Sequence, residues 1–236
     1  MLRIVFISAR FSGRITYRSI TTAKGAERMF EIQVKSPNFS KPDNEGGDVL
    51  LKYRSPTVIN VNKFSEESAK EFREAMTKAQ DTGQPIIPIV IDSYGGEVYS
   101  LLKMVDIIRA SSVPVATICL GKAMSCGAVL LTCGAEGHRY MAPTATVMIH
   151  DVATFAMGKC EEIKAEAKET DRLNKLVFKV MADNCGKEAG YFSKLVHEKG
   201  HADWFLDADE VKKHGIANHL RIPKMKIEFN AEMTFG

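Results

Sequence analysis

Acidic residues are absent from the first 26 positions of this 236-residue chain, since the first of them is Glu27. Five basic residues fall in the same stretch, and the other 210 residues hold 27 basic and 29 acidic ones. The net charge of +3 therefore comes from the N-terminal segment, and the body of the chain is slightly acidic. Such a body offers no basic surface for nucleic acid, so we expect no nucleic acid partner.

Long apolar runs are also missing. Arg109, Lys122 and Glu136 interrupt the most apolar region well before the ~20 residues that a membrane span requires. The start of the chain lacks the continuous apolar run of a secretory signal, although its Arg- and Ser-rich composition is similar to that of a transit peptide. We therefore expect no membrane partner and a cytoplasmic location, or an organelle if residues 1–28 are a transit peptide. Met29 offers an alternative start.

No pair of cysteines has the CxxC spacing. The five cysteines are odd in number, which argues against a disulfide framework or a cysteine metal site and favours a reducing compartment.

With 45% hydrophobic and 26% charged residues, the chain has the composition of one globular domain. Residues 36–48 are rich in Pro, Gly, Ser and Asn, so we expect an N-terminal extension and linker over 1–48, a main domain over 49–222 and a tail over 223–236.

Strand and helix patterns alternate along the main domain. The expected strands cover residues 49–53, 57–61, 85–91, 113–120, 138–142 and 146–149. One expected helix begins after the N-cap Ser65, and three more cover residues 97–109, 125–135 and 158–184. A last expected helix follows a capping box of Asp207 and Glu210. Residues 121–124 are expected to form a loop. Repeated units of this kind imply an α/β fold with a mainly parallel sheet covered by helices.

Three segments are candidates for an active site. Ser125 lies where a strand, a glycine loop and a helix meet, so free N–H groups and the helix dipole would stabilise negative charge there, as an acyl-transfer nucleophile requires. An equally weighted alternative is that its small neighbours only let the helix approach the sheet. Gly95 and Gly96 follow a buried strand and can form either an oxyanion hole or a simple turn. His150 ends a strand, where it is placed for general-base work.

A competing pattern lies further along. His197, Glu198 and His201 spell H-E-x-x-H, in which two histidines one helical turn apart bind zinc and the glutamate acts as base. Gly200 lies inside the turn that must be helical, at a cost of about 1 kcal/mol relative to Ala. A third ligand is not evident, so we expect no metal, although a zinc metallopeptidase stays open as an alternative.

The order and spacing of these motifs resemble the proteolytic subunit of the Clp protease, ClpP, over residues 49–220. Three segments carry the resemblance: IDSYGGEV, TICLGKAMSCGAVLLTCGAEGHRYMAPTATVMIH and ADWFLDADEVKKHGIA. It implies a crotonase-like core with a protruding helical handle, which suits the long helix over 158–184. It also implies a serine endopeptidase without a cofactor, which cleaves protein or peptide substrates inside a homo-oligomer of stacked rings.

The resemblance assigns roles to single residues. It makes Ser125 the nucleophile, His150 the general base and Asp203 the triad acid, with Asp151 and Asp207 as alternative acids. It also places the oxyanion hole at the backbone N–H groups of Gly96 and Cys126.

The chain departs from the family pattern at several points. Asp92 and Tyr94 replace an asparagine and a proline, the family's Gln-Pro and Gly-rich loop after the histidine is replaced, and the N-terminal segment does not match the loops that engage an ATPase. An AAA+ unfoldase partner is therefore one expectation, and an ATP-independent peptidase of the phage type is the other. A crotonase-type acyl-CoA enzyme or an inactive scaffold on the same fold is a further alternative.

Overall fold

The structure, a computed structural model, describes residues 16–19, 29–33, 51–54 and 56–224, which belong to two compact units. In the first unit, β1 (Thr16–Ser19), β2 (Met29–Gln33) and β3 (Leu51–Arg54) form an antiparallel sheet in the order β1-β2-β3. The predicted strand over 49–53 overlaps β3 and thus belongs to this sheet. The predicted linker over 36–48 and most of the predicted transit segment lie outside the described residues.

The second unit, residues 56–223, is built on a six-stranded sheet in the order β4-β5-β6-β8-β9, with β7 also paired to β6. Its strands are β4 (Ile59–Val61), β5 (Ile87–Ser93), β6 (Val115–Met124), β7 (Arg139–Met141), β8 (Thr146–Ile149) and β9 (Trp204–Leu206). All pairs are parallel except β8 with β9. The predicted mainly parallel α/β sheet is confirmed, and β9 is an additional strand that the sequence pattern does not predict.

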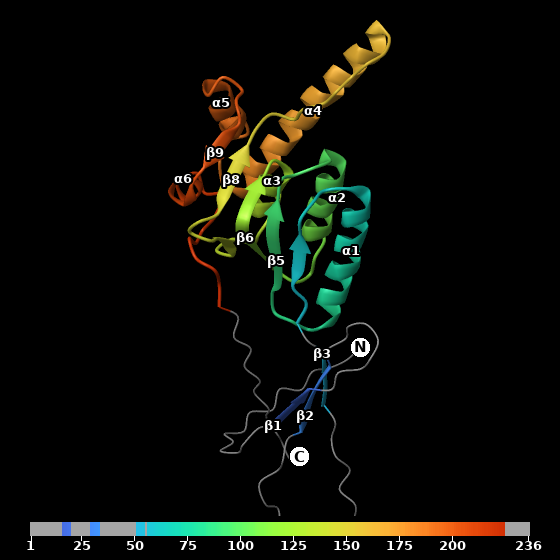
Figure 1. Ribbon diagram of the computed structural model, residues 1–236, viewed down its shortest axis with the longest axis vertical. Coiled ribbons are helices and arrows are strands. Elements are labelled where there is room, and N and C mark those ends of the chain that lie inside the picture. Colours follow the sequence, from blue (N-terminus) through green and yellow to red (C-terminus); the bar gives the residue numbers. More distant parts are fainter. Residues whose placement is uncertain (1–15, 20–28, 34–50, 55, 225–236) are drawn as a thin grey trace, which may run out of the picture. The chain divides into compact units, whose positions relative to one another are not determined.

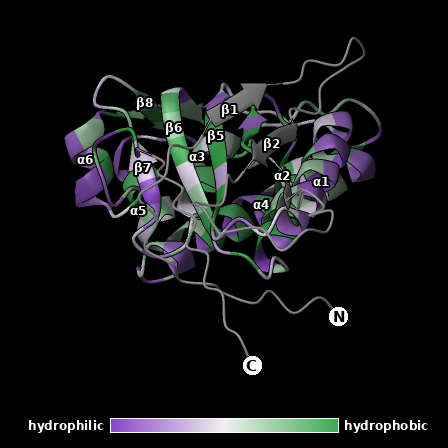
Figure 2. Cartoon of the chain, turned by 90° about the horizontal axis from the view of Figure 1, so that it is seen from below, coloured by the Kyte–Doolittle hydropathy of each residue, from purple (hydrophilic) through white to green (hydrophobic). Residues whose placement is uncertain are grey.

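Six helices surround this sheet (Figure 1). They are α1 (Glu66–Asp81), α2 (Val98–Arg109), α3 (Cys126–Thr132), α4 (Cys160–Asn184), α5 (Tyr191–Glu198) and α6 (Ala208–Lys213). Seen from below, β5 and β6 are mainly hydrophobic, while the outer helices α1 and α6 carry many hydrophilic residues (Figure 2). Within the described ranges, no helix is both long and apolar enough to cross a bilayer.

Local sequence explains where α1 begins. The Ser65 side chain accepts a hydrogen bond from the Ser68 amide, and the Ser68 hydroxyl accepts one from the Ser65 amide. Capping of this kind satisfies N–H groups that have no partner inside the helix. The face that the helical spacing predicted is buried against the core, namely Ala69, Phe72, Met76 and Ala79. The predicted helix and its N-cap are therefore confirmed.

The expected loop over 121–124 is wrong, because β6 continues to Met124. Residues 117–119 of β6 pair with β7, and residues 122–124 pair with β8. Gly121 lies between the two pairings with a φ of +76°, a conformation that glycine adopts at little cost. The strand thus bends from one partner to the next, and its end delivers Ser125 directly to the start of α3.

The apolar stripe predicted along the whole of α4 is buried only in its second half. Buried residues begin at Leu173, whereas Ile163 is 42% exposed. The N-terminal part of α4 extends beyond the sheet and the other helices of this unit (Figure 1). This is the shape of the handle that the resemblance implied.

Candidate active site

Ser125 joins the end of β6 to the first turn of α3 with a φ of +54° and a ψ of −118°. This is an uncommon conformation for a residue with a side chain, and such strain persists only where the surroundings enforce it. Here the Ser125 amide donates a hydrogen bond to the Met148 carbonyl at 2.8 Å, while the Ser125 carbonyl accepts from the amide of Ala128 at 3.0 Å. The backbone thus holds Ser125 at the N-terminus of α3.

Gly95 and Gly96 follow β5 and have φ values of +108° and +148°. A Cβ on Gly95 would lie 2.7 Å from the Cβ of Ser125, so only glycine lets this segment approach the serine so closely. A Cβ on Gly96 would collide with the backbone of Phe64, whose carbonyl accepts a hydrogen bond from the Glu97 amide at 3.0 Å. The pair is therefore more than a turn, because it packs the loop against Ser125.

The backbone N–H groups of Gly96 and Cys126 are the predicted oxyanion donors. The Cys126 thiol donates to the carbonyl oxygen of Gly96 at 3.2 Å, which joins the two segments. Burial raises the pKa of Cys126 to about 11, so the thiol stays protonated at neutral pH and remains a donor.

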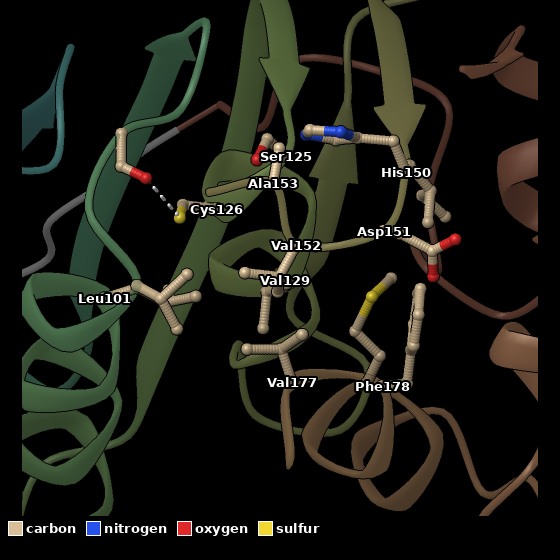
Figure 3. A pocket seen from close by; sticks show the side chains of 14 residues that line it. Leu101, Ser125, Cys126, Val129, His150, Asp151, Val152, Ala153, Val177 and Phe178 are labelled. Atoms are coloured by element: carbon tan, nitrogen blue, oxygen red, sulfur yellow. Dashed lines mark hydrogen bonds between the residues drawn. The ribbon is translucent and has the colours of Figure 1, made fainter. Parts of the chain in front are cut away.

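His150 directly follows β8, and its ring points toward Ser125 (Figure 3). Both residues line one pocket. The Nδ1 atom of His150 lies 4.0 Å from Oδ1 of Asp203, just before β9. The structure thus brings together Ser125, His150 and Asp203 from three separate parts of the chain.

The two alternative acids have other partners. Asp207 caps α6, since its Oδ1 accepts from the Glu210 amide at 2.9 Å. The carboxylate of Asp151 points away from Ser125 (Figure 3) and is bound to the side chains of Asn174 and His201. Burial works to raise the pKa of Asp151, but these two hydrogen bonds outweigh it, and the pKa lies below its usual value. The geometry therefore favours Asp203 as the partner of His150.

The H-E-x-x-H segment does not form the helix that a zincin requires. Helix α5 ends at Glu198, and Gly200 and His201 have φ values of +71° and +58°. The Nδ1 of His197 lies 2.7 Å from Nε2 of His201, so the two rings bond to each other. In the part of the chain that the structure describes, no group of three or more His, Cys, Asp or Glu side chains could hold a metal ion. The zinc alternative is not favoured.

The pocket beside Ser125 has a mostly apolar wall, formed by α2, α3, the end of β8 and α4 (Figure 3). Its apolar lining residues are Val98, Leu101, Val129, Ile149, Val152, Ala153, Val177, Phe178 and Met181. An apolar pocket next to a nucleophile suits an apolar side chain of a substrate.

Asp92 and Tyr94, two residues that depart from the family pattern, both contact Lys122. The Nζ of Lys122 lies 2.7 Å from Oδ1 of Asp92 and 4.2 Å above the ring centre of Tyr94. The lysine on β6 thus contacts both replaced residues of the neighbouring segment, by an ion pair and a cation–π interaction. Sequence reasoning missed this contact, because only strand pairing brings Lys122 beside Asp92.

Comparisons with known proteins point to one protein family. A family model described as Clp protease matches residues 48–222. The chain is 34% identical over 175 residues to the ATP-dependent Clp protease proteolytic subunit 1 of Rhodopirellula baltica, covering 74% of each chain. It is 38% identical over 179 residues to the ATP-dependent Clp protease proteolytic subunit of Bacteroides thetaiotaomicron, covering 75% of this chain and 80% of the relative.

Proposed function

The chain belongs to the Clp protease family, and on this premise we propose that it cleaves peptide bonds with Ser125, His150 and Asp203 as a catalytic triad. Membership makes it a ClpP-like serine-type endopeptidase. One observation supports the assignment of the residues most strongly. Ser125 and His150 line the same pocket, and Ser125 lies at the N-terminus of a helix.

The reaction follows from these positions. His150 removes the hydroxyl proton of Ser125 as Oγ attacks the carbonyl carbon of the scissile bond. The negative charge on the carbonyl oxygen is stabilised by the N–H groups of Gly96 and Cys126. As the C–N bond breaks, His150 gives its proton to the leaving amine, and an acyl ester remains on Ser125. Water, deprotonated by His150, then hydrolyses the ester and restores the serine.

Asp203 supports His150 in both steps. A carboxylate near Nδ1 favours the tautomer in which Nε2 is free to take the serine proton, and it stabilises the imidazolium that forms. The separation of 4.0 Å is longer than a hydrogen bond. Such contacts are often loose without substrate and tighten in the reacting complex.

The working form that we propose is a homo-oligomer with an enclosed chamber. The exposed first half of α4 and the segment before it carry large apolar side chains, with Phe155 88% and Met157 86% exposed. Exposed apolar groups gathered in one region are typical of protein interfaces. A native mass of many subunits supports the chamber, and a monomer contradicts it.

The relatives are named subunits of an ATP-dependent protease, so we further propose an ATPase partner.

The test of the triad is labelling with a fluorophosphonate, which reacts with activated serines. We expect the full-length chain to be labelled and to cleave a short peptide, and Ser125→Ala to lose both. Ser193→Ala, which changes a half-buried serine on α5, is the matched control and should keep both activities. Labelling that persists in Ser125→Ala would show that another residue is the nucleophile.

A further inference from the structure

Beside the proposed triad lies a chain of hydrogen bonds that the reaction above does not use. It runs from Asn174 on α4 through Asp151 to His201 and ends at His197 on α5. Asp151 is the residue after His150, and His201 is two residues before Asp203. The chain therefore connects the segment that carries the proposed base with the segment that carries the proposed acid.

Asn174 fixes one end of this chain. Its Oδ1 accepts a hydrogen bond from the Val152 amide at 3.0 Å, and its Nδ2 donates to Oδ1 of Asp151 at 2.7 Å. One side chain of α4 thus holds both the backbone and the carboxylate of the segment after β8. The other carboxylate oxygen of Asp151 remains for the contact with His201.

The contact between Asp151 and His201 is short, and only His201 can donate its hydrogen bond. Its Nδ1 lies 2.5 Å from Oδ2 of Asp151, across 50 positions of sequence. A carboxylate can only accept, so the proton lies on Nδ1 of His201. In the neutral ring, Nε2 is then an acceptor, and it faces Nδ1 of His197 at 2.7 Å. The ring of His201 is thus held on both sides.

The backbone of His201 is unusual as well. Its φ of +58° lies in the left-handed region, which is unfavourable for a residue with a Cβ. Such a conformation persists when surrounding contacts enforce it. The contacts to Asp151 and His197 are those that the structure shows for this side chain.

Asp203 has little support of its own. Its side chain is 56% exposed, and within the described residues its carboxylate makes no hydrogen bond and approaches only His150, at 4.0 Å. An exposed carboxylate without partners samples many orientations, so its position relative to His150 depends on the backbone that carries it. That backbone is fixed two residues earlier, where His201 bonds to Asp151.

We propose that the Asp151–His201 contact is a positioning contact that holds Asp203 in place against His150 during peptide hydrolysis. The inference rests on the proposed triad and assigns a role to two residues that do not touch the substrate bond. Asp151 acts through the main chain of His150, and His201 acts through the main chain of Asp203. His201, the second histidine of the H-E-x-x-H segment, thus supports the active site of a serine protease.

Two substitutions of His201 separate the hydrogen bond from the backbone. His201→Asn keeps an N–H donor near the position of Nδ1, and asparagine tolerates a positive φ. His201→Gly accommodates the same φ but has no donor. We expect His201→Gly to lower kcat for a short peptide by up to about 100-fold with little change in KM, since small misplacement of catalytic groups has effects of this size. His201→Asn should keep most of the wild-type kcat.

A second comparison tests whether the two residues act together. Asp151→Ala should lower kcat at least as much as His201→Gly does, since it also removes the bond to Asn174. The double variant should lose no more than Asp151→Ala alone, because each single variant already removes the contact between Asp151 and His201. Equal kcat in the His201→Gly and wild-type proteins, or equal losses in the Asn and Gly variants, would overturn the inference. A change in KM alone would also overturn it.

The proposed triad is tested separately in the same experiment. Fluorophosphonate labelling that is lost in Ser125→Ala, together with unchanged kcat in His201→Gly, would keep the triad and reject the positioning contact. Labelling that persists in Ser125→Ala would reject the triad itself. Thermal unfolding of each variant, measured alongside, shows whether a loss of kcat comes from a loss of folded protein, which would also count against the positioning role.

Discussion

Nδ1 of His150 and Oδ1 of Asp203 lie 4.0 Å apart, within the range of an ion pair and beyond that of a hydrogen bond. The two side chains are 26% and 56% exposed. Water therefore screens their attraction in the free protein. A bound peptide that covers the pocket would remove this screening and strengthen the contact at the moment when His150 becomes charged.

We predict that Asp203→Asn lowers kcat by roughly 10²–10⁴-fold, because an amide neither holds the required imidazole tautomer nor stabilises its charged form. Steady-state cleavage of a short peptide measures this loss. Asp207→Asn is the matched control, since asparagine caps a helix about as well as aspartate and Asp207 caps α6. A larger fall in kcat for Asp207→Asn than for Asp203→Asn would assign the acid to Asp207 instead.

Gly96→Ala is predicted to abolish peptide cleavage. The new Cβ would collide with the backbone of Phe64, and the φ of +148° is unfavourable for alanine, so the segment with the proposed oxyanion donor must move. Gly137→Ala is the control, because Gly137 also has a positive φ but its Cβ would meet open space. We expect Gly137→Ala to cost about 1–2 kcal/mol of stability in chemical unfolding and to leave kcat unchanged. Full activity of Gly96→Ala would argue against the proposed oxyanion hole.

Features that depend on neighbouring residues could be predicted from the sequence. The N-cap at Ser65 and the capping box of Asp207 and Glu210 each involve residues three positions apart, and the structure contains both. The strand–helix alternation also predicted the parallel sheet. Such local patterns act before any tertiary contact forms, so they can be recognised without knowledge of the fold.

Features that depend on distant pairing could not be predicted. The sequence pattern predicts a loop over the residues that form the end of β6. The bend of the strand at Gly121 can be explained only by its pairing with both β7 and β8, which the sequence does not reveal. The sequence leaves the zinc reading of the H-E-x-x-H pattern open as an alternative for the same reason, since the contact of His201 with Asp151 spans 50 positions and accompanies a non-helical backbone. Asp203 was identified through family resemblance, and its placement as the triad acid stays a prediction.

The apolar pocket predicts the preference of the enzyme for substrates. We expect peptides with an apolar residue before the scissile bond to have a higher kcat/KM than those with a charged one, because burial of a charge without a partner is costly. Val98→Phe adds bulk to the pocket wall and should lower kcat/KM for large apolar residues more than for alanine. Val58→Phe, at an exposed position before β4, is the control. An equal effect of both variants on all peptides would contradict this role of the pocket.

His214 makes the stability of the fold depend on pH. The residue is buried, its Nδ1 lies 2.9 Å from the hydroxyl of Tyr191, and its ring packs edge-on against Trp204. Burial, with a further contribution from Lys213, lowers the pKa of His214 below the ordinary 6.5. The folded state thus favours the neutral ring, which can accept the hydrogen bond of Tyr191.

We therefore predict that this contribution to stability is complete above pH 6.5 and is lost as the pH falls from 6.5 through the pKa of the folded state, because the unfolded chain binds a proton there and the folded one does not. His214→Gln removes the titrating group, so its urea midpoint should fall less between pH 7.5 and 5.5 than that of the wild-type protein at the same concentration. His138→Gln, which alters a histidine in the turn before β7, is the control and should behave like wild type. Parallel losses of stability in the wild-type and His214→Gln proteins would show that another group controls the acid sensitivity.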